Sequence, residues 1–177
     1  MPSLELLLEA VRLKSLSRAG WVRKGVPTPE TVASHSWGVA WLVVALLPPE
    51  LDRGRALAYA TLHDLPEVRV GDITPVDGVS AEDKATREHA AMRALGASAP
   101  HVQELWEAYE RQQDPEARFV RELDRLDMAI QALAHHQAGH AGMAEFVASA
   151  RSFIRHPALV PLVEAIHAAL PSGAPPR

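Results

Sequence analysis

A short segment, residues 62–75, gathers four side chains that can hold a metal ion or move a proton. It reads LHDLPEVRVGDITP and places His63 beside Asp64, followed by Glu67 and Asp72. On a continuous helix, residues three and four positions apart share one side, so His63, Asp64 and Glu67 would converge. The segment therefore suggests one half of a metal site. The alternative is a solvated, charged helix end, which the His-Asp dipeptide alone would favour.

Pro66 interrupts this segment. A proline inside a helix removes a backbone hydrogen bond and disfavours helical geometry at the preceding residue, Leu65. We therefore expect the helix to end or kink there and to leave Glu67 on the following turn.

Further candidate ligands lie in two other segments. His35 occupies the first turn of an apolar helix, and the segment FVRELDRLDMAIQAL carries Asp124 and Asp127 beside an apolar stripe. A helical wheel puts Asp127 nearer the stripe, so periodicity alone nominates Asp127 as the buried acid. A buried carboxylate needs a partner, and a metal ion is one such partner. The simpler alternatives are a structural histidine and exposed acids facing Arg121 and Arg125.

Two imidazoles and two carboxylates suit a divalent transition ion such as Mn, Fe, Co, Ni or Zn. A water on such an ion is a nucleophile at neutral pH, and Glu67 or Asp72 could position it or transfer its proton. A phosphate ester is a suitable electrophile, because cations can neutralise its oxygens. The basic stretch around Arg18 could hold a phosphate, with Trp21 as a stacking surface for a base. An ordinary charged loop with one packed tryptophan explains that stretch at least as well.

A competing cluster is AHHQAGH, in which His136 and His140 lie four residues apart. Their position near a helix C-terminus, with a glycine between them, favours exposed histidines that interact with the helix dipole. The sequence contains no HExxH, P-loop, GxSxG or GxGxxG motif, so it gives no support to zincin, Walker-type, hydrolase-elbow or dinucleotide-binding functions.

The elements that must position these residues are helices, because apolar residues recur at three- and four-residue spacing and strict alternation is scarce. The fold class is therefore expected to be all-α. Asp52, Ser34 and Asp114 are the expected N-caps of three of the helices. Residues 17–33 and 68–80, rich in Gly and Pro, are expected to be irregular. The expected helices are 3–15, 34–47, 52–65, 80–95, 100–112, 115–137, 141–153 and 157–169.

The whole chain fits one domain, which we place at 1–170, followed by a flexible tail at 171–177. With 177 residues, a formal charge of −4 and no cysteine, it offers no disulfide, no thiolate chemistry and no general affinity for nucleic acid polymers. The N-terminus lacks the features of a signal peptide. The apolar run at 39–47 is far shorter than the roughly 20 residues that cross a membrane. We expect a cytoplasmic protein that does not bind membranes.

The ordered set of His35, His63-Asp64 and Asp124 in a helical chain resembles the HD-domain metal-dependent phosphohydrolases. The segments RAGWVRKGVPTPETVASHSWGVA, LHDLPEVRVGDITP and EARFVRELDRLDMAIQAL look like those of the HD-domain 5′-deoxynucleotidases, and the similarity runs over most of residues 4–165. The resemblance also selects Asp124 over Asp127 as the metal ligand, against the helical wheel.

The resemblance implies an enzyme with a compact helical HD fold of about six to eight helices, assembled as a homodimer, that removes phosphate from deoxynucleoside 5′-monophosphates. One divalent ion (Co, Mn, Mg, Zn, Fe or Ni) would assist. The implied roles are metal binding by His35, His63, Asp64 and Asp124, catalysis by Glu67 and Asp72, and substrate binding by Arg18 and Trp21. Two alternatives stay open: hydrolysis of a ribonucleotide, a nucleoside triphosphate or a cyclic nucleotide, and a non-catalytic regulatory protein with a structural metal.

Overall fold

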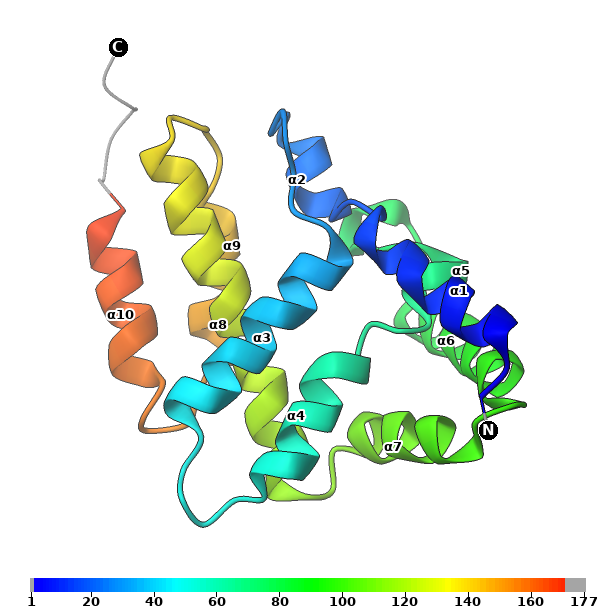
Figure 1. Cartoon of the computed structure of the whole chain (residues 1–177). Coiled ribbons are helices and arrows are strands. Elements are labelled where there is room, and N and C mark those ends of the chain that lie inside the picture. The colour runs from blue at the N-terminus through cyan, green and yellow to red at the C-terminus, as the bar shows by residue number, and fades with distance from the viewer. Residues whose placement is uncertain (1, 171–177) are drawn as a thin grey trace.

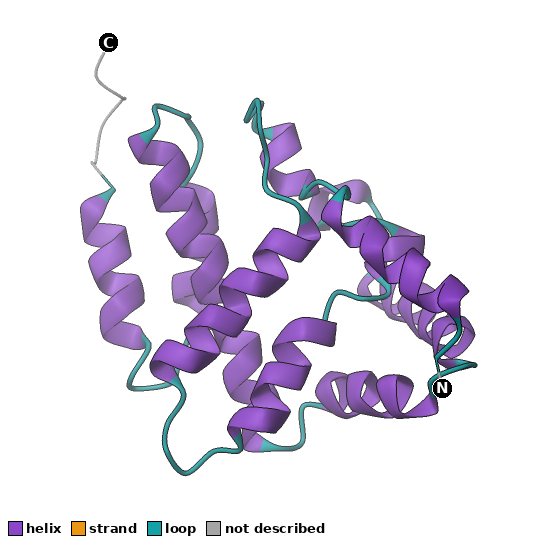
Figure 2. Ribbon diagram, viewed as in Figure 1, coloured by secondary structure: helices purple, strands orange, loops and turns teal. Residues whose placement is uncertain are grey.

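The computed structural model describes residues 2–170, and this part of the chain consists of helices joined by loops (Figure 2). The expected all-α class is confirmed, with one isolated backbone bridge between Ser17 and Thr31. The tail expected at 171–177 lies outside the described residues. Within residues 2–170, no helix is both long and apolar enough to span a bilayer.

The helices follow one another closely along the chain. In order, they are α1 (Leu4–Val11), η1 (Arg12–Lys14, 3₁₀), α2 (Ala19–Arg23), α3 (Val32–Leu46), α4 (Arg53–Leu62), α5 (Glu67–Val70), η2 (Pro75–Asp77, 3₁₀), α6 (Ala81–Gly96), α7 (Pro100–Arg111), α8 (Pro115–Gln137), α9 (Ala144–Phe153) and α10 (Val160–Ala169).

The helices form two groups that meet along one seam (Figure 1). In the first group α3 packs on α4 and α8, and α9 and α10 cover α8. In the second group α6 packs on α7 and α5. Each group has its own apolar cluster, one centred on α3, α4 and α8 and the other on residues such as Leu13, Val68, Met92 and Trp106. Of the candidate ligands, His35 and Asp124 lie on α3 and α8 of the first group, and His63 and Asp64 lie in the turn that leads from α4 to α5 of the second group.

Most of the expected helices are confirmed to within three residues at each end. Asp52 and Asp114 cap α4 and α8 as expected, because their side chains accept the backbone N–H of Arg55 and Ala117. The expectation that Ser34 caps its helix is wrong. Thr31 is the cap of α3 and accepts the N–H of Ser34, because the bridge to Ser17 holds Thr31 extended just before the helix begins.

The two segments expected to be irregular contain short helices. Residues 17–33 include α2, and residues 68–80 include the end of α5 and the 3₁₀ turn η2. Backbone hydrogen bonds from Arg18 N–H to Glu30 O and from Val32 N–H to Leu16 O join the two ends of the first segment. This pairing places Arg18 beside the start of α3.

Pro66 acts as expected. The helix predicted at 52–65 ends at Leu62, and Pro66 is the N-cap of α5, whose first residue is Glu67. Hydrogen bonds from Leu65 N–H to Leu62 O and from Glu67 N–H to Asp64 O make a tight turn between the two helices. His63 and Asp64 lie in this turn, and Glu67 follows as the first residue of α5.

Candidate metal centre and active site

Three predicted ligands meet in the seam. Donor atoms of His35 on α3, and of His63 and Asp64 in the turn after α4, all lie within 4.8 Å of one another. The Nε2 atoms of the two histidines are 3.3 Å apart, and Asp64 Oδ2 lies 3.2 Å from His63 Nε2. Asp124 comes from α8 and places Oδ1 3.1 Å from His35 Nε2. The sequence therefore selected four residues that the fold brings together.

Both imidazoles use Nδ1 elsewhere and turn Nε2 toward the cluster. His63 Nδ1 lies 2.9 Å from the carbonyl oxygen of Ala60, and His35 Nδ1 lies 2.7 Å from Asp127 Oδ2. Because these partners only accept hydrogen bonds, each Nδ1 carries the proton. In their neutral forms the histidines thus direct two Nε2 lone pairs at each other, and such an arrangement needs a positive charge between them.

A divalent ion fits that requirement. Ligand atoms that each lie about 2.0–2.2 Å from one ion stand roughly 3–3.5 Å apart. The separations from His35 Nε2 to Asp124, His63 and Asp64 are 3.1, 3.3 and 3.7 Å. Two imidazoles and two carboxylates are also a donor set that divalent transition ions accept. This His/Asp cluster could therefore hold a metal ion.

The charges of the ligands point the same way. Burial opposes ionisation of Asp64, but His63 and Arg18 outweigh it and hold the pKa of Asp64 well below its ordinary value. Asp124 behaves alike, because His35 overcomes the effect of burial and lowers the pKa of Asp124. Burial and Arg18 would lower the pKa of His35, yet its hydrogen bonds to Asp124 and Asp127 raise it to about 9. A cluster without an ion thus attracts protons in its place.

Arg18 lies at the edge of the cluster and is almost buried. Its Nη1 is 3.4 Å from Asp64 Oδ2 and 3.9 Å from Asp72 Oδ1. Asp72 also accepts the backbone N–H of Ala19 at 2.7 Å, which ties Asp72 to the first residue of α2. Asp72 therefore anchors the segment that carries Arg18, and the guanidinium is held next to the candidate metal ligand Asp64.

Glu67 is the first residue of α5, three residues after Asp64, and is only 3% exposed. Its Oε2 atom has no hydrogen-bond partner among residues 2–170. Burial, followed by the nearby charges of Asp64 and Asp72, raises the pKa of Glu67 well above its ordinary value. A buried acid with a raised pKa beside a candidate metal centre is suited to hold and transfer a proton.

Trp21, predicted to stack on a base, is instead part of the protein interior. Its side chain is 2% exposed, and its ring packs against His135 and Phe146. The indole N–H donates to Glu30 Oε1 at 2.8 Å. Because the indole ring is almost completely covered by protein, it offers no surface on which a base could stack, and its N–H instead holds Glu30 in place.

The competing histidine segment forms no comparable centre. His135, rather than His136, faces His140, with ring centroids 5.7 Å apart. Among the described residues, the groups of three or more possible metal ligands involve His35 with His63 and Asp64, or His35 with Glu30 and Asp127.

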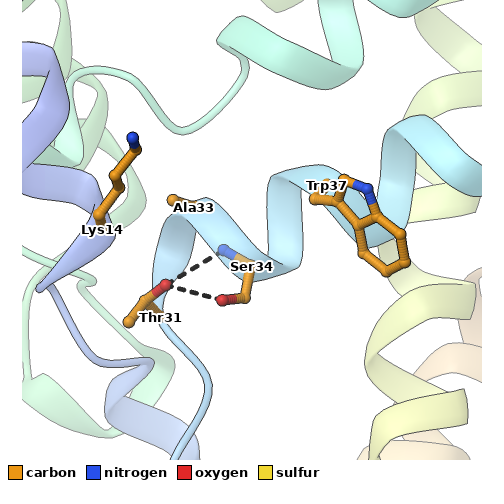
Figure 3. Close-up of a pocket in the computed structure, with 5 residues that line it drawn as sticks. All are labelled: Lys14, Thr31, Ala33, Ser34 and Trp37. Atoms are coloured by element: carbon orange, nitrogen blue, oxygen red, sulfur yellow. Dashed lines mark hydrogen bonds between the residues drawn. The ribbon is translucent and has the colours of Figure 1, made fainter.

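A separate groove of about 450 Å³ opens on the other side of α3. It is lined by Lys14, Thr31, Ala33, Ser34 and Trp37 (Figure 3). The hydrogen bonds that cap α3 run along its wall, from Ser34 N–H and between the two hydroxyls of Thr31 and Ser34. Since no candidate metal ligand lines this groove, it is distinct from the cluster.

Several contributors to the site escaped the sequence analysis. Trp106 on α7 donates its indole N–H to the carbonyl oxygen of His63 at 3.1 Å and fixes the end of α4. Tyr109 packs its ring against that of His63. No local pattern marks either residue. Both lie on the buried side of the amphipathic helix α7, and the residue that they contact, His63, is 43 or more positions away in sequence. Asp127 did carry a signal, since the helical wheel had nominated it as the buried acid.

Comparisons with known proteins agree with this geometry. A family model described as HD domain matches residues 10–159. The 5′-deoxynucleotidase HDDC2 of Xenopus laevis is 36% identical over 163 residues, covering 88% of this chain and 81% of that protein. The human protein of the same name is 34% identical over 172 residues, covering 93% and 84%. The crystal structure of the PH0347 protein from Pyrococcus horikoshii OT3 superposes with a TM-score of 0.82 at 30% identity, over 94% of this chain and 99% of that one.

Proposed function

Because the chain belongs to the HD domain phosphohydrolase family, we propose that it is a metal-dependent 5′-deoxynucleotidase that removes phosphate from deoxynucleoside 5′-monophosphates. The similarity to 5′-deoxynucleotidases extends over most of the chain and of those relatives. The observation that carries the proposal is the pair of Nε2 atoms, 3.3 Å apart, that face each other beside the carboxylates of Asp64 and Asp124.

We propose that His35, His63, Asp64 and Asp124 hold one divalent ion, whose identity among Co, Mn, Mg, Zn, Fe and Ni the residues leave open. When bound, the ion supplies positive charge to a phosphoryl oxygen and lowers the pKa of a water. His35 and His63 are buried, and the side chains of Asp64 and Asp124 are only 17% and 19% exposed, so bulk solvent screens that charge less than it would at the surface.

Arg18 is the proposed phosphate-binding residue. Burial alone would lower its pKa, but Asp64 and Asp72 raise it, so the guanidinium stays charged. Its Nη1 is already oriented by these two carboxylates at 3.4 and 3.9 Å, so the other N–H groups of the guanidinium are the ones proposed to bind a phosphate. Positioning of this kind lowers the entropic cost of ordering the substrate.

Glu67 is the proposed general acid and base. Its carboxyl group is buried, has an oxygen without a partner among the described residues and is not one of the four ligands. It would take a proton from the attacking water and return it toward the leaving 5′-oxygen. Asp72 would contribute by holding Arg18 and the start of α2 in place.

The test is a phosphate-release panel. The metal-free chain is reconstituted with Co²⁺, Mn²⁺, Mg²⁺ or Zn²⁺ and given deoxy- and ribonucleoside mono- and triphosphates and a cyclic nucleotide. We expect metal-dependent release that favours deoxynucleoside monophosphates. Release only from triphosphates, ribonucleotides or cyclic nucleotides would replace the substrate class, and no release from any monophosphate would contradict the proposal.

We further propose a homodimer located in the cytoplasm. An exposed apolar stripe on α3 supports the dimer: Trp37, Trp41 and Val44 are 71%, 54% and 51% exposed and share one face. A face of this kind, on a helix without charged residues, can pair with its own copy. Light scattering should give twice the monomer mass for the wild type and for the control Val76→Glu, but the monomer mass for Trp41→Glu. A monomeric wild type would contradict the dimer.

The proposed location in the cytoplasm is checked by fluorescence microscopy of a tagged chain.

A further inference from the structure

His35 is contacted at both ring nitrogens. Its Nε2 faces the metal cluster, and its Nδ1 lies 2.7 Å from Asp127 Oδ2. The ring is completely buried, so no water competes for these contacts. A carboxylate on Nδ1 keeps the proton on that nitrogen and leaves the Nε2 lone pair free for an ion.

Gly38 makes room for the Asp127 carboxylate. It lies three residues after His35 on α3, on the same side of the helix. A Cβ atom at position 38 would stand 2.2 Å from Asp127 Oδ1, and its three nearest neighbours would all be Asp127 atoms. The absence of a side chain at this position therefore lets the carboxylate of α8 lie directly against α3.

A second metal ion is the competing explanation, because donor atoms of Glu30, His35 and Asp127 also lie within 4.8 Å of one another. The separation of 2.7 Å between His35 Nδ1 and Asp127 Oδ2 argues against it. Two ligands of one ion, each at about 2.0–2.2 Å, stand roughly 3 Å or more apart, whereas 2.7 Å is an ordinary charge-assisted hydrogen bond. Glu30 is also engaged by the indole N–H of Trp21.

We propose that Asp127, seated against Gly38, is a positioning residue that holds His35 in the orientation and tautomer required for metal binding. The inference rests on the proposed function only in that it takes His35 as a metal ligand. Both aspartates of α8 then have a role: Asp124 contacts the Nε2 side of His35, and Asp127 contacts the Nδ1 side.

The test measures Co²⁺ affinity of the metal-free chain by competition with a chelator, together with the visible absorption of bound Co²⁺. Asp127→Asn should bind Co²⁺ about 10–100-fold more weakly, because loss of a carboxylate that supports a ligating histidine has effects of this size. The matched control is Glu122→Gln on the same helix. Glu122 accepts the backbone N–H groups of Arg155 and His156, away from the cluster, so its loss should leave Co²⁺ affinity unchanged.

Gly38→Ala provides an independent check through a double-mutant cycle. The added Cβ should displace the Asp127 carboxylate and weaken Co²⁺ binding by itself. In an Asp127→Ala background the carboxylate is gone, so Gly38→Ala should weaken binding little further. Circular dichroism verifies that each variant is folded.

Three results would overturn the inference: wild-type Co²⁺ affinity in folded Asp127→Asn, fully additive losses in the cycle, or two Co²⁺ ions per chain of which the second is lost with Asp127. Failure of the proposed function looks different. If the wild type releases no phosphate but Asp127→Asn still weakens Co²⁺ binding, the positioning role stands without the nucleotidase.

Discussion

Replacement of Glu67 by Gln separates proton transfer from metal binding. Gln has nearly the shape of Glu and fills the same buried position, which is 3% exposed, but it cannot take up or release a proton at neutral pH. General acid–base catalysis contributes about 10²- to 10⁴-fold. We therefore expect kcat to fall by that factor, which corresponds to about 3–5 kcal/mol in the activation barrier.

The same substitution should change stability with a defined sign. In the metal-free chain burial, Asp64 and Asp72 raise the pKa of Glu67, so the folded state binds this proton more tightly than the unfolded state, whose ordinary pKa is 4.5. The contribution of Glu67 to stability is thus lost as the pH rises above 4.5. Gln does not titrate, so Glu67→Gln lacks that loss. The free energy of unfolding of the variant, minus that of the wild type, should therefore increase as the pH rises above 4.5.

Three measurements on the wild type and on Glu67→Gln check these expectations: steady-state phosphate release, Co²⁺ affinity, and urea unfolding at a series of pH values. Glu116→Gln is the matched control. Glu116 is a buried carboxylate that accepts the backbone N–H of Asp52, far from the cluster, so turnover should persist. Wild-type turnover in Glu67→Gln would refute the catalytic role. A loss of Co²⁺ affinity as large as the loss of turnover would make Glu67 a ligand.

Three further substitutions, with Arg23→Ala as a control, test the other roles. His63→Ala removes a ligand atom that faces His35 at 3.3 Å, so inductively coupled plasma analysis should find the chain depleted of metal; full occupancy would exclude His63 as a ligand. Arg18→Ala removes the proposed phosphate contact, and since charge-assisted hydrogen bonds contribute about 1.5–3 kcal/mol, kcat/KM should fall roughly 10- to 150-fold. The control is Arg23→Ala: the guanidinium of Arg23 pairs with Asp77 and Thr74, so its removal should leave kcat/KM unchanged. Equal losses of kcat/KM in the two variants would show that Arg18 has no specific role in phosphate binding. Asp72→Asn keeps an acceptor for Ala19 N–H but loses the charge beside Arg18, so KM should rise more than kcat falls; a loss of kcat as large as in Glu67→Gln would instead indicate proton transfer by Asp72.

The periodicity of apolar residues, together with cap residues and prolines, was sufficient to predict most of the helices. The caps Asp52 and Asp114 and the helix-ending effect of Pro66 follow from local chemistry, and the structure confirms them. The start of α3 was misplaced because its cap, Thr31, is held extended by a bridge to Ser17, a contact outside any local window.

The candidate ligands could be selected from the sequence, but the residues that support them could not. His35, His63, Asp64 and Asp124 carry recognisable side chains, whereas Trp106 and Gly38 act through contacts with distant segments. Periodicity and resemblance disagreed over Asp124 and Asp127. The structure reconciles them, because the two acids contact opposite nitrogens of His35.

Hydrolysis in ¹⁸O-labelled water, followed by ³¹P nuclear magnetic resonance, tests the central claim most directly. The chain reconstituted with Co²⁺ is given a deoxynucleoside 5′-monophosphate, and a sample without metal serves as control. The account predicts inorganic phosphate that carries one ¹⁸O atom, an unlabelled nucleoside, and no phosphate in the metal-free sample. Label in the nucleoside, or the same release without metal, would contradict it.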